Sequence, residues 1–269
     1  MSTERVVVVT GASTGIGRSV ADRLHRDGWH VIGASRRGTG PEGGWTPVTM
    51  DVDDDRSVTT VLDSVIGTHG SIHALVACAG WGLAGPVEQT QIGDAKAQLE
   101  TNFWGAVRVV QSVLPIMRRQ AAGRIILVSS IGGVIGIPFQ AFYSASKFAM
   151  EGYGEALAYE VAPFGIHVSL VQPGNVRTDF TGSRRKVNPP EGDNPYARTC
   201  GKAVELMERD EASGVPPEDV SAVIAKLLGD KRPRRRVSVG KMGERVGIVA
   251  KRVLPHRLFE SAAKSSLGV

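Results

Sequence analysis

Short apolar runs alternate along this chain with segments in which apolar residues recur every three or four positions. The short runs predict seven strands, at 5–10, 30–35, 47–50, 73–79, 124–130, 166–172 and 235–240. Helical patterns lie between them, near 15–27, 55–68, 91–119, 142–162 and 217–228. Strands that are almost wholly apolar and are separated by helices are typical of a parallel sheet covered on both faces. We therefore expect one doubly wound α/β domain that spans residues 1–269.

The alternation is interrupted at about 181–215, where the chain begins "TGSRRKVNPPEGDNPY". Its Pro, Gly and charged residues predict a long excursion, which in compact domains is usually a lid or a binding element. We expect a mobile substrate lid that proteases cut first at Arg184, Arg185 or Lys186. Residues 197–212 are helical in pattern, so we favour the alternative in which they form a packed helix and only about 181–196 is flexible.

Composition excludes several classes of protein. The chain is 42% hydrophobic and 22% charged, it has two cysteines, and its histidines have no metal-ligand spacing. No apolar run reaches the roughly 18 residues of a membrane span. We expect neither a disulfide framework, a metal site nor an integral membrane segment, and we expect a cytoplasmic location.

Charge is unevenly distributed, because the tail at about 231–269 holds eleven Lys and Arg against two Glu, a net +9 in a chain whose total is +5. An amphipathic helix there, with Val246, Val249 and Val253 on one face, would suit a membrane surface. Packing of this helix on its own domain or on a subunit partner is the alternative. The tail lacks the interleaved aromatic residues of a single-strand binder, so no nucleic-acid partner is expected.

A glycine turn follows the first strand, where "VVVVTGASTGIG" places Gly11, Gly15 and Gly17 before a helix. Such a turn lets a pyrophosphate approach the helix N-terminus, so we predict nucleotide binding in a Rossmann-type fold. The second strand ends in Ser35, Arg36 and Arg37 and offers no acidic residue. An acid there would bind the ribose 2′-hydroxyl of NAD, whereas arginine accommodates a 2′-phosphate. The sequence therefore favours NADP(H) over NAD(H).

Tyr143 and Lys147 lie four residues apart, which places them on one face of a helix. A cation held beside a phenol favours the phenolate, so we expect Lys147 to lower the pKa of Tyr143. Alone, a pair at this spacing more often indicates a packed tyrosine beside a solvated lysine.

Taken together, six motifs resemble the classical short-chain dehydrogenase/reductase family over about residues 5–240. They are "TGASTGIG", "MDV", "ACAG", "TNFWG", "VSS" followed by "YSASK", and "PGNVRT". Further similarity, in "GWGLAGPVEQ" and the region after Pro138, is to the 17β-hydroxysteroid and retinol dehydrogenase branch. One departure is that Ala77 and Cys78 replace the two asparagines of the family's strand-end motif, which puts some rigidity there in doubt.

The resemblance implies the site. The implied catalytic residues are Asn102, Ser130, Tyr143 and Lys147, in which Ser130 polarises a carbonyl, Tyr143 is the general acid/base and Asn102 holds a water that relays protons to Lys147. The implied cofactor contacts are Gly11, Ser13, Thr14, Gly15, Ile16, Gly17, Ser35, Arg36, Arg37, Asp51, Val52, Ala79, Gly80, Asn102, Tyr143, Lys147, Pro173, Gly174, Val176 and Thr178. The implied substrate contacts are Ser130, Tyr143, Trp81, Leu83, Ile137, Phe139 and residues of the lid.

The predicted function is hydride transfer between NADP(H) and an alcohol or ketone of a lipophilic small molecule, such as a steroid or retinoid. A homodimer or homotetramer is expected. The alternatives are a non-catalytic NADP(H)-binding sensor, whose Ser/Tyr/Lys set would be broken, and a membrane-surface protein that acts through the basic tail.

Overall fold

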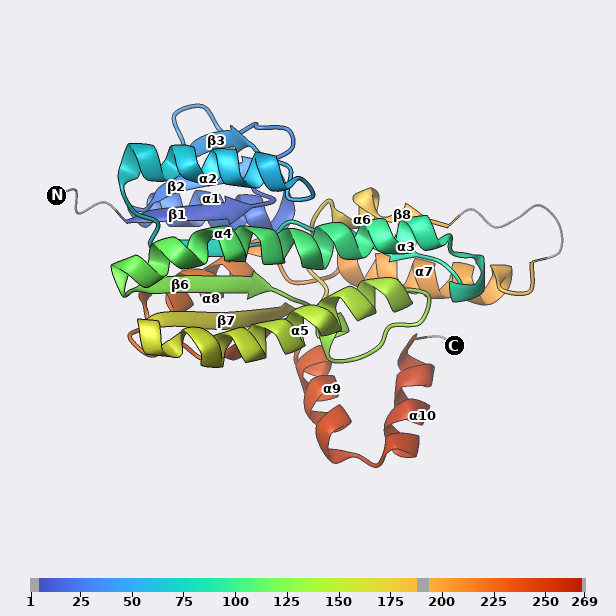
Figure 1. The fold of residues 1–269 in the computed structure, drawn as a ribbon. Helices are drawn as coiled ribbons and strands as arrows, with labels where there is room; N and C mark the ends of the chain where they lie inside the picture. The colour runs from blue at the N-terminus through green and yellow to red at the C-terminus, as the bar shows by residue number, and fades with distance from the viewer. Residues whose placement is uncertain (1–4, 188–193, 268–269) are drawn as a thin grey trace.

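The fold is built on a parallel sheet of seven strands in the order β3-β2-β1-β4-β6-β7-β9 (Figure 1). It is taken from a computed structural model that describes residues 5–187 and 194–267. The strands are β1 (Val6–Thr10), β2 (His30–Ser35), β3 (Thr46–Thr49), β4 (Ala74–Ala77), β6 (Gly123–Val128), β7 (Ile166–Pro173) and β9 (Arg236–Val239). All six pairings are parallel, as the apolar strands predicted, and the doubly wound α/β fold is confirmed.

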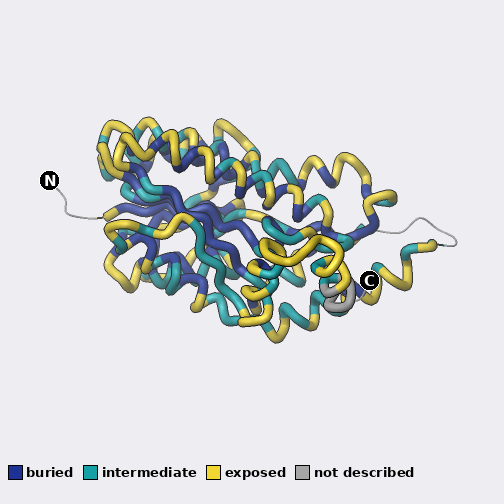
Figure 2. The backbone as a smooth tube through the Cα atoms, turned by 90° about the horizontal axis from the view of Figure 1, so that it is seen from below, coloured by how far each residue is buried: buried dark blue, intermediate teal, exposed yellow. Residues whose placement is uncertain are grey.

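Helices cover both faces of this sheet. The apolar side chains of α1 (Gly15–Arg26) and α8 (Pro217–Gly229) belong to one core cluster, and those of α2 (Asp55–His69), α4 (Gly105–Gln120) and α5 (Ala141–Val161) belong to the other. Figure 2 shows the buried strands inside and exposed residues on the outer helix surfaces. Local sequence sets the ends of these helices: Asp54 caps α2 by accepting from the Arg56 and Ser57 amides.

The long helix expected at 91–119 is interrupted. It consists of α3 (Ile92–Leu99), a π-helical segment (Glu100–Trp104) and α4. A π turn contains one residue more than an α turn, and such turns are frequent at functional sites. The hydrophobic pattern does not reveal it, because both flanking parts keep the same period.

The described residues of the excursion after β7 largely form regular secondary structure. They form α6 (Phe180–Ser183), β8 (Arg185–Lys186), which pairs with β5 (Leu83–Ala84), and α7 (Ala197–Ala212), which coincides with the helical alternative. Residues 188–193 of the predicted lid lie outside the described part of the chain. The prediction that proteases cut at Arg184 is wrong, because the Arg184 side chain is fully buried and paired with Glu211.

The C-terminal tail forms two helices where one was expected, α9 (Met242–Val253) and α10 (His256–Leu267), because Pro255 ends the first. Short 3₁₀ turns lie at Val87–Gln89, Ile131–Gly133 and Ala162–Phe164. No helix in the described residues is long and apolar enough to cross a membrane.

Candidate active site

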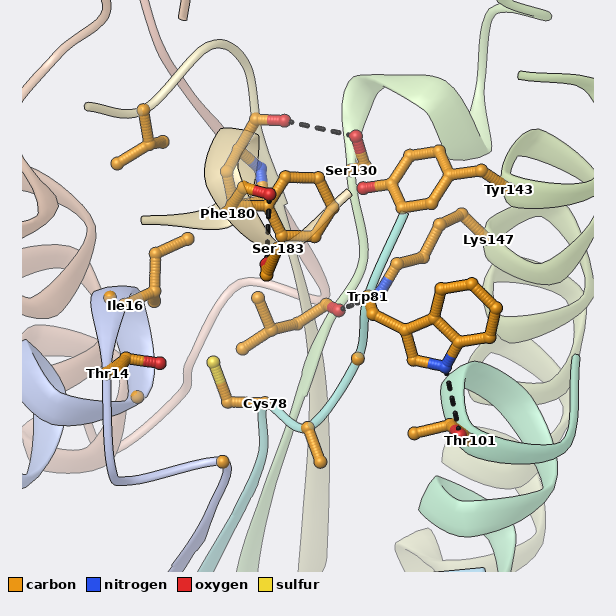
Figure 3. Close-up of a pocket in the computed structure, with 18 of the residues that line it drawn as sticks. Thr14, Ile16, Cys78, Trp81, Thr101, Ser130, Tyr143, Lys147, Phe180 and Ser183 are labelled. Atoms are coloured by element: carbon orange, nitrogen blue, oxygen red, sulfur yellow. Dashed lines mark hydrogen bonds between the residues drawn. The ribbon is translucent and has the colours of Figure 1, made fainter. Parts of the chain in front are cut away.

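A cleft of about 690 Å³ opens at the carboxyl ends of the central strands (Figure 3). Segments that follow β1, β2, β4, β6 and β7 contribute to its wall. Ligands of open α/β sheets bind at this edge, and a volume of this size accommodates a ligand of several hundred daltons.

The glycine turn lies at one end of the cleft and requires glycine at two positions. Gly11 has a φ of +69°, and a Cβ there would lie 2.9 Å from the Ala79 backbone. A Cβ at Gly17 would lie 2.3 Å from the Gly11 carbonyl oxygen. The N-terminus of α1 is therefore packed against the strand and left open toward the cleft, where its free amides can bind a phosphate.

Ser35, Arg36 and Arg37 line the cleft beside this turn. Arg37 donates from Nη2 to the hydroxyl of Ser13 at 2.9 Å, which brings its guanidinium to the glycine turn. A basic, hydroxyl-bearing corner of this kind has the donors that a phosphate group on a ribose requires.

The implied reaction centre comes together at the other end of the cleft. Ser130 follows β6, and Tyr143 and Lys147 lie on α5, so strand and helix supply the groups from two sides. Figure 3 shows the Ser130 and Tyr143 hydroxyls directed at the same space. The Ser130 hydroxyl accepts from the Gly132 amide at 3.0 Å, and this contact fixes its position.

The expectation that Lys147 lowers the pKa of Tyr143 is wrong. Burial raises the pKa of Tyr143 above its usual 10.0, and a hydrogen bond with Ser130 opposes the rise. The Lys147 Nζ lies 5.9 Å from the centre of the Tyr143 ring and donates to the Val128 carbonyl at 2.9 Å. Burial lowers the pKa of Lys147 from its usual 10.5 to about 8, and the neighbouring Cys78 and Glu151 oppose this shift.

Asn102, in the π-helical segment, is fully buried and binds Trp81 rather than facing the cleft. Its Oδ1 accepts from the Trp81 amide at 2.9 Å, and its Nδ2 donates to the Trp81 carbonyl at 2.9 Å and to Ser146 at 3.2 Å. The neighbouring Thr101 accepts from the Trp81 indole at 3.1 Å. Asn102 thus anchors the loop after β4, and its water relay stays a prediction.

The strand end that lacks the two asparagines is held by a hydroxyl. Thr10, at the end of β1, accepts from the amides of Cys78 at 3.0 Å and Ala79 at 3.1 Å. Thr10 on the neighbouring strand therefore holds the segment at Ala77 and Cys78 in place, although the asparagines are absent. The sequence did not indicate this contact.

Some of the remaining implied residues line the cleft and others do not. Trp81 and Ile137 line the cleft, whereas Leu83, Phe139 and Thr178 do not. The substrate assignments of Leu83 and Phe139 are corrected: Leu83 is buried in β5, and Phe139 has a φ of +58° while its carbonyl accepts from the Gly85 amide. Every other implied cofactor residue except Asn102 lines the cleft.

The sequence predicted substrate contacts from the lid without naming its residues in the wall at the reaction centre. Phe180, with its ring 5.9 Å from that of Tyr143, lies there with Gln140, Ser183, Arg185 and Glu211. Helix α7 and the β5–β8 pair bring several of these residues in, and none belongs to a recognisable motif. The deviation of 181–215 from strand–helix alternation was the one available signal.

Comparison with known proteins agrees with this geometry. A protein-family model described as short chain dehydrogenase matches residues 5–189. The chain belongs to this family. The 3-ketodihydrosphingosine reductase of Bacteroides thetaiotaomicron is 38% identical over 260 residues, with 97% of each chain covered. Like other short-chain dehydrogenases, this one is an oxidoreductase that acts on CH–OH groups with a nicotinamide cofactor.

Other members of the family are similar along most of their length. Retinol dehydrogenase 8 of Bos taurus is 37% identical, covering 87% of this chain and 81% of the relative. Human 17-beta-hydroxysteroid dehydrogenase type 1 is 34% identical, covering 86% and 76%. The solved structure of a short-chain dehydrogenase from Streptomyces avermitilis superposes with a TM-score of 0.84 at 29% identity, covering 98% and 99%.

Proposed function

We propose that this short-chain dehydrogenase uses NADP(H) and reduces a ketone on a lipophilic small molecule. The observation that carries the proposal is the convergence of Ser130, Tyr143 and Lys147 at one end of a cleft whose other end is the glycine turn with Arg36 and Arg37. A nicotinamide cofactor supplies and accepts the hydride. The chain must position that cofactor, orient the carbonyl and deliver a proton.

The residues of the cleft fit such a cofactor. Close backbone packing at Gly11 and Gly17 leaves the α1 N-terminus open for a pyrophosphate, and Lys147, which lines the other end of the cleft, would hold a ribose. The link from Arg37 to Ser13 supports a 2′-phosphate at the adenosine end, and with it the preference for NADP(H).

Reduction as the working direction requires a proton donor at the carbonyl oxygen, and we assign this role to Tyr143. A buried phenol whose pKa is raised keeps its proton at neutral pH, so it can donate that proton to a carbonyl oxygen as hydride arrives at the carbon. Ser130 donates a second hydrogen bond to the same oxygen and stabilises the charge that develops there. Oxidation needs the phenolate, so its rate should rise toward alkaline pH while reduction stays nearly constant around neutrality.

A lipophilic substrate is supported by the wall around Tyr143. Trp81, Ile131, Ile137 and Phe180 give this end of the cleft a large apolar surface. The names of three relatives refer to a sphingoid ketone, to retinol and to a hydroxysteroid. We infer that this enzyme likewise takes an apolar skeleton that carries an alcohol or carbonyl group, and we propose a ketone as the group it reduces.

Cofactor titration tests the proposal. We expect NADPH to bind at least about ten-fold more tightly than NADH, since a charge-assisted contact contributes about 1.5–3 kcal/mol and 1.4 kcal/mol is a factor of ten. Arg36→Asp should lower or reverse the ratio of NADPH affinity to NADH affinity. Arg118→Asp makes the same charge change on the last turn of α4, at the opposite edge of the sheet, and should leave it unchanged. Equal or tighter NADH binding by the parent protein would refute the preference.

The non-catalytic sensor is the competing function, and a panel of lipophilic ketones with NADPH separates the two. A complete Ser130, Tyr143 and Lys147 set at the cleft argues for catalysis. Homodimer or homotetramer formation, the lid function of 181–215, the single-domain assignment and the cytoplasmic location stay predictions.

A further inference from the structure

The C-terminal hairpin, formed by α9 and α10, projects from the body of the molecule (Figure 1). Several of its apolar side chains are exposed to solvent. Met242, Val246, Val249 and Val253 recur at helical spacing and form what we call the valine stripe. The three valines are 56%, 58% and 70% exposed, and no described residue covers them. Leu254 and Leu258 extend this surface across the turn into α10.

The opposite face of α9 attaches the hairpin to the body. Glu244 accepts from the Asn175 amide at 2.9 Å, Lys251 donates to the Val134 carbonyl, and Ile248 is buried. Because residues on this face contact the body of the protein, they fix the orientation of α9. The valine stripe therefore points outward because the opposite face of α9 is packed against the body of the protein.

Charge decides which partner fits this surface. Arg245 and Arg252 lie on α9 beside the valine stripe, and Arg257 follows on α10; all three are exposed. Glu244, the acid of α9, faces the body, and Glu260 is paired with His256. A second copy would bring the same cations against these arginines, whereas an anionic surface would neutralise them.

We propose that the hairpin binds an anionic phospholipid surface, with the valine stripe inserted at the headgroup level and Arg245, Arg252 and Arg257 on the lipid phosphates. An amphipathic helix with a basic polar face binds membranes in this way without crossing them. Each cation near the surface adds to the attraction, and salt screens it. This binding does not depend on the proposed catalytic function.

The hairpin also adjoins the substrate end of the cleft. Lys251 contacts the loop 131–137, whose Ile131 and Ile137 line the cleft, and α10 lies against α7, which supplies Glu211 to the wall. A protein docked by the valine stripe would hold this end of the cleft near the lipid. If the proposed function is right, a lipophilic ketone could pass from membrane to enzyme without crossing bulk water.

Vesicle sedimentation tests the docking with the full-length protein. At about 0.1 M salt we expect it to sediment with vesicles of phosphatidylcholine and phosphatidylglycerol and not with phosphatidylcholine alone. Val249→Asp should weaken this binding at least about ten-fold, and Arg245→Glu with Arg252→Glu should do the same. The matched controls are Ile92→Asp, at an exposed apolar residue of α3, and Arg118→Glu with Arg119→Glu at the end of α4.

Three outcomes would overturn the proposal. The first is no sedimentation with anionic vesicles. The second is binding that the arginine variant abolishes and Val249→Asp leaves intact, which would indicate a general polyanion contact. The third is a dimer, seen by analytical ultracentrifugation without lipid, that Val249→Asp converts to monomer, which would make the valine stripe a subunit interface. Thermal unfolding by circular dichroism checks that each variant folds, and failure of NADPH turnover would bear on the proposed function alone.

Discussion

Lys147 is a cation held inside the protein, and its burial has a cost that depends on pH. Its pKa is lowered from 10.5 to about 8, so between these values the unfolded chain binds the proton more tightly than the folded one. The destabilisation is fully present below pH 8 and is relieved as pH rises to 10.5. It amounts to about 3 kcal/mol at pH 7, an order-of-magnitude figure from 1.36 kcal/mol per pH unit.

Replacing Lys147 with methionine tests this cost. The free energy of unfolding of Lys147→Met, relative to the parent, should fall by about 2 kcal/mol from pH 7 to pH 10, because only the parent gains stability on losing the proton. Loss of the bond to the Val128 carbonyl affects both pH values alike and cancels in this comparison. Urea denaturation at the two pH values measures it. If the difference in free energy of unfolding between Lys147→Met and the parent did not change with pH, the Lys147 ammonium would be well solvated in the folded protein.

Tyr143→Phe tests the proton donor directly. The variant removes the phenolic hydroxyl and leaves the ring against Phe180, so NADPH affinity should persist while turnover falls about 100- to 10,000-fold. Fluorescence titration with NADPH and steady-state reduction of a responsive ketone give the two quantities. Retention of more than roughly a tenth of the activity would show that another group supplies the proton.

At the scale of elements, the contact between β1 and the loop after β4 depends on one hydroxyl. Thr10→Val keeps the shape of the side chain and deprives the Cys78 and Ala79 amides of their acceptor. Leaving a buried donor unpaired costs about 1–3 kcal/mol. Because these two amides are only partly buried, we expect a loss toward the lower end of twice that range, about 2–4 kcal/mol in the free energy of unfolding. Thr59→Val, at an exposed threonine of α2, should stay within about 0.5 kcal/mol.

Apolar pattern located the strands and most helices, because a covered parallel sheet forces nearly continuous apolar runs. Ser130, Tyr143 and Lys147 were found through the family resemblance of "VSS" and "YSASK", motifs that mark one strand end and one helix face. Glu211 and Phe180 were not, since tertiary packing of α6 and α7 brings them to the cleft. Leu83 was misplaced because a two-residue pairing with β8 leaves no periodic signal.

For the whole molecule, cofactor and fold should stabilise each other. NADPH at about 100 times its dissociation constant adds about 2.7 kcal/mol to the folded state, which for this chain length raises the Tm by about 5–10 °C. If NADPH binds ten-fold more tightly, NADH at the same concentration should give about half of that shift. Differential scanning fluorimetry compares the two. Equal shifts would contradict the role of Arg36 and Arg37.

The π turn before α4 has a consequence for how this site can change. Thr101 and Asn102 are adjacent in sequence and both bind Trp81: the Thr101 hydroxyl accepts from its indole, and the Asn102 side chain pairs with its backbone amide and carbonyl. The extra residue of the π turn shifts every residue that follows it by one position relative to a regular α-helix. No substitution at another position can make up for that residue if it is lost. Deletion of one residue within 100–104 should straighten the helix and release Trp81, so in descendants of this chain the arrangement is protected by length and not only by residue identity.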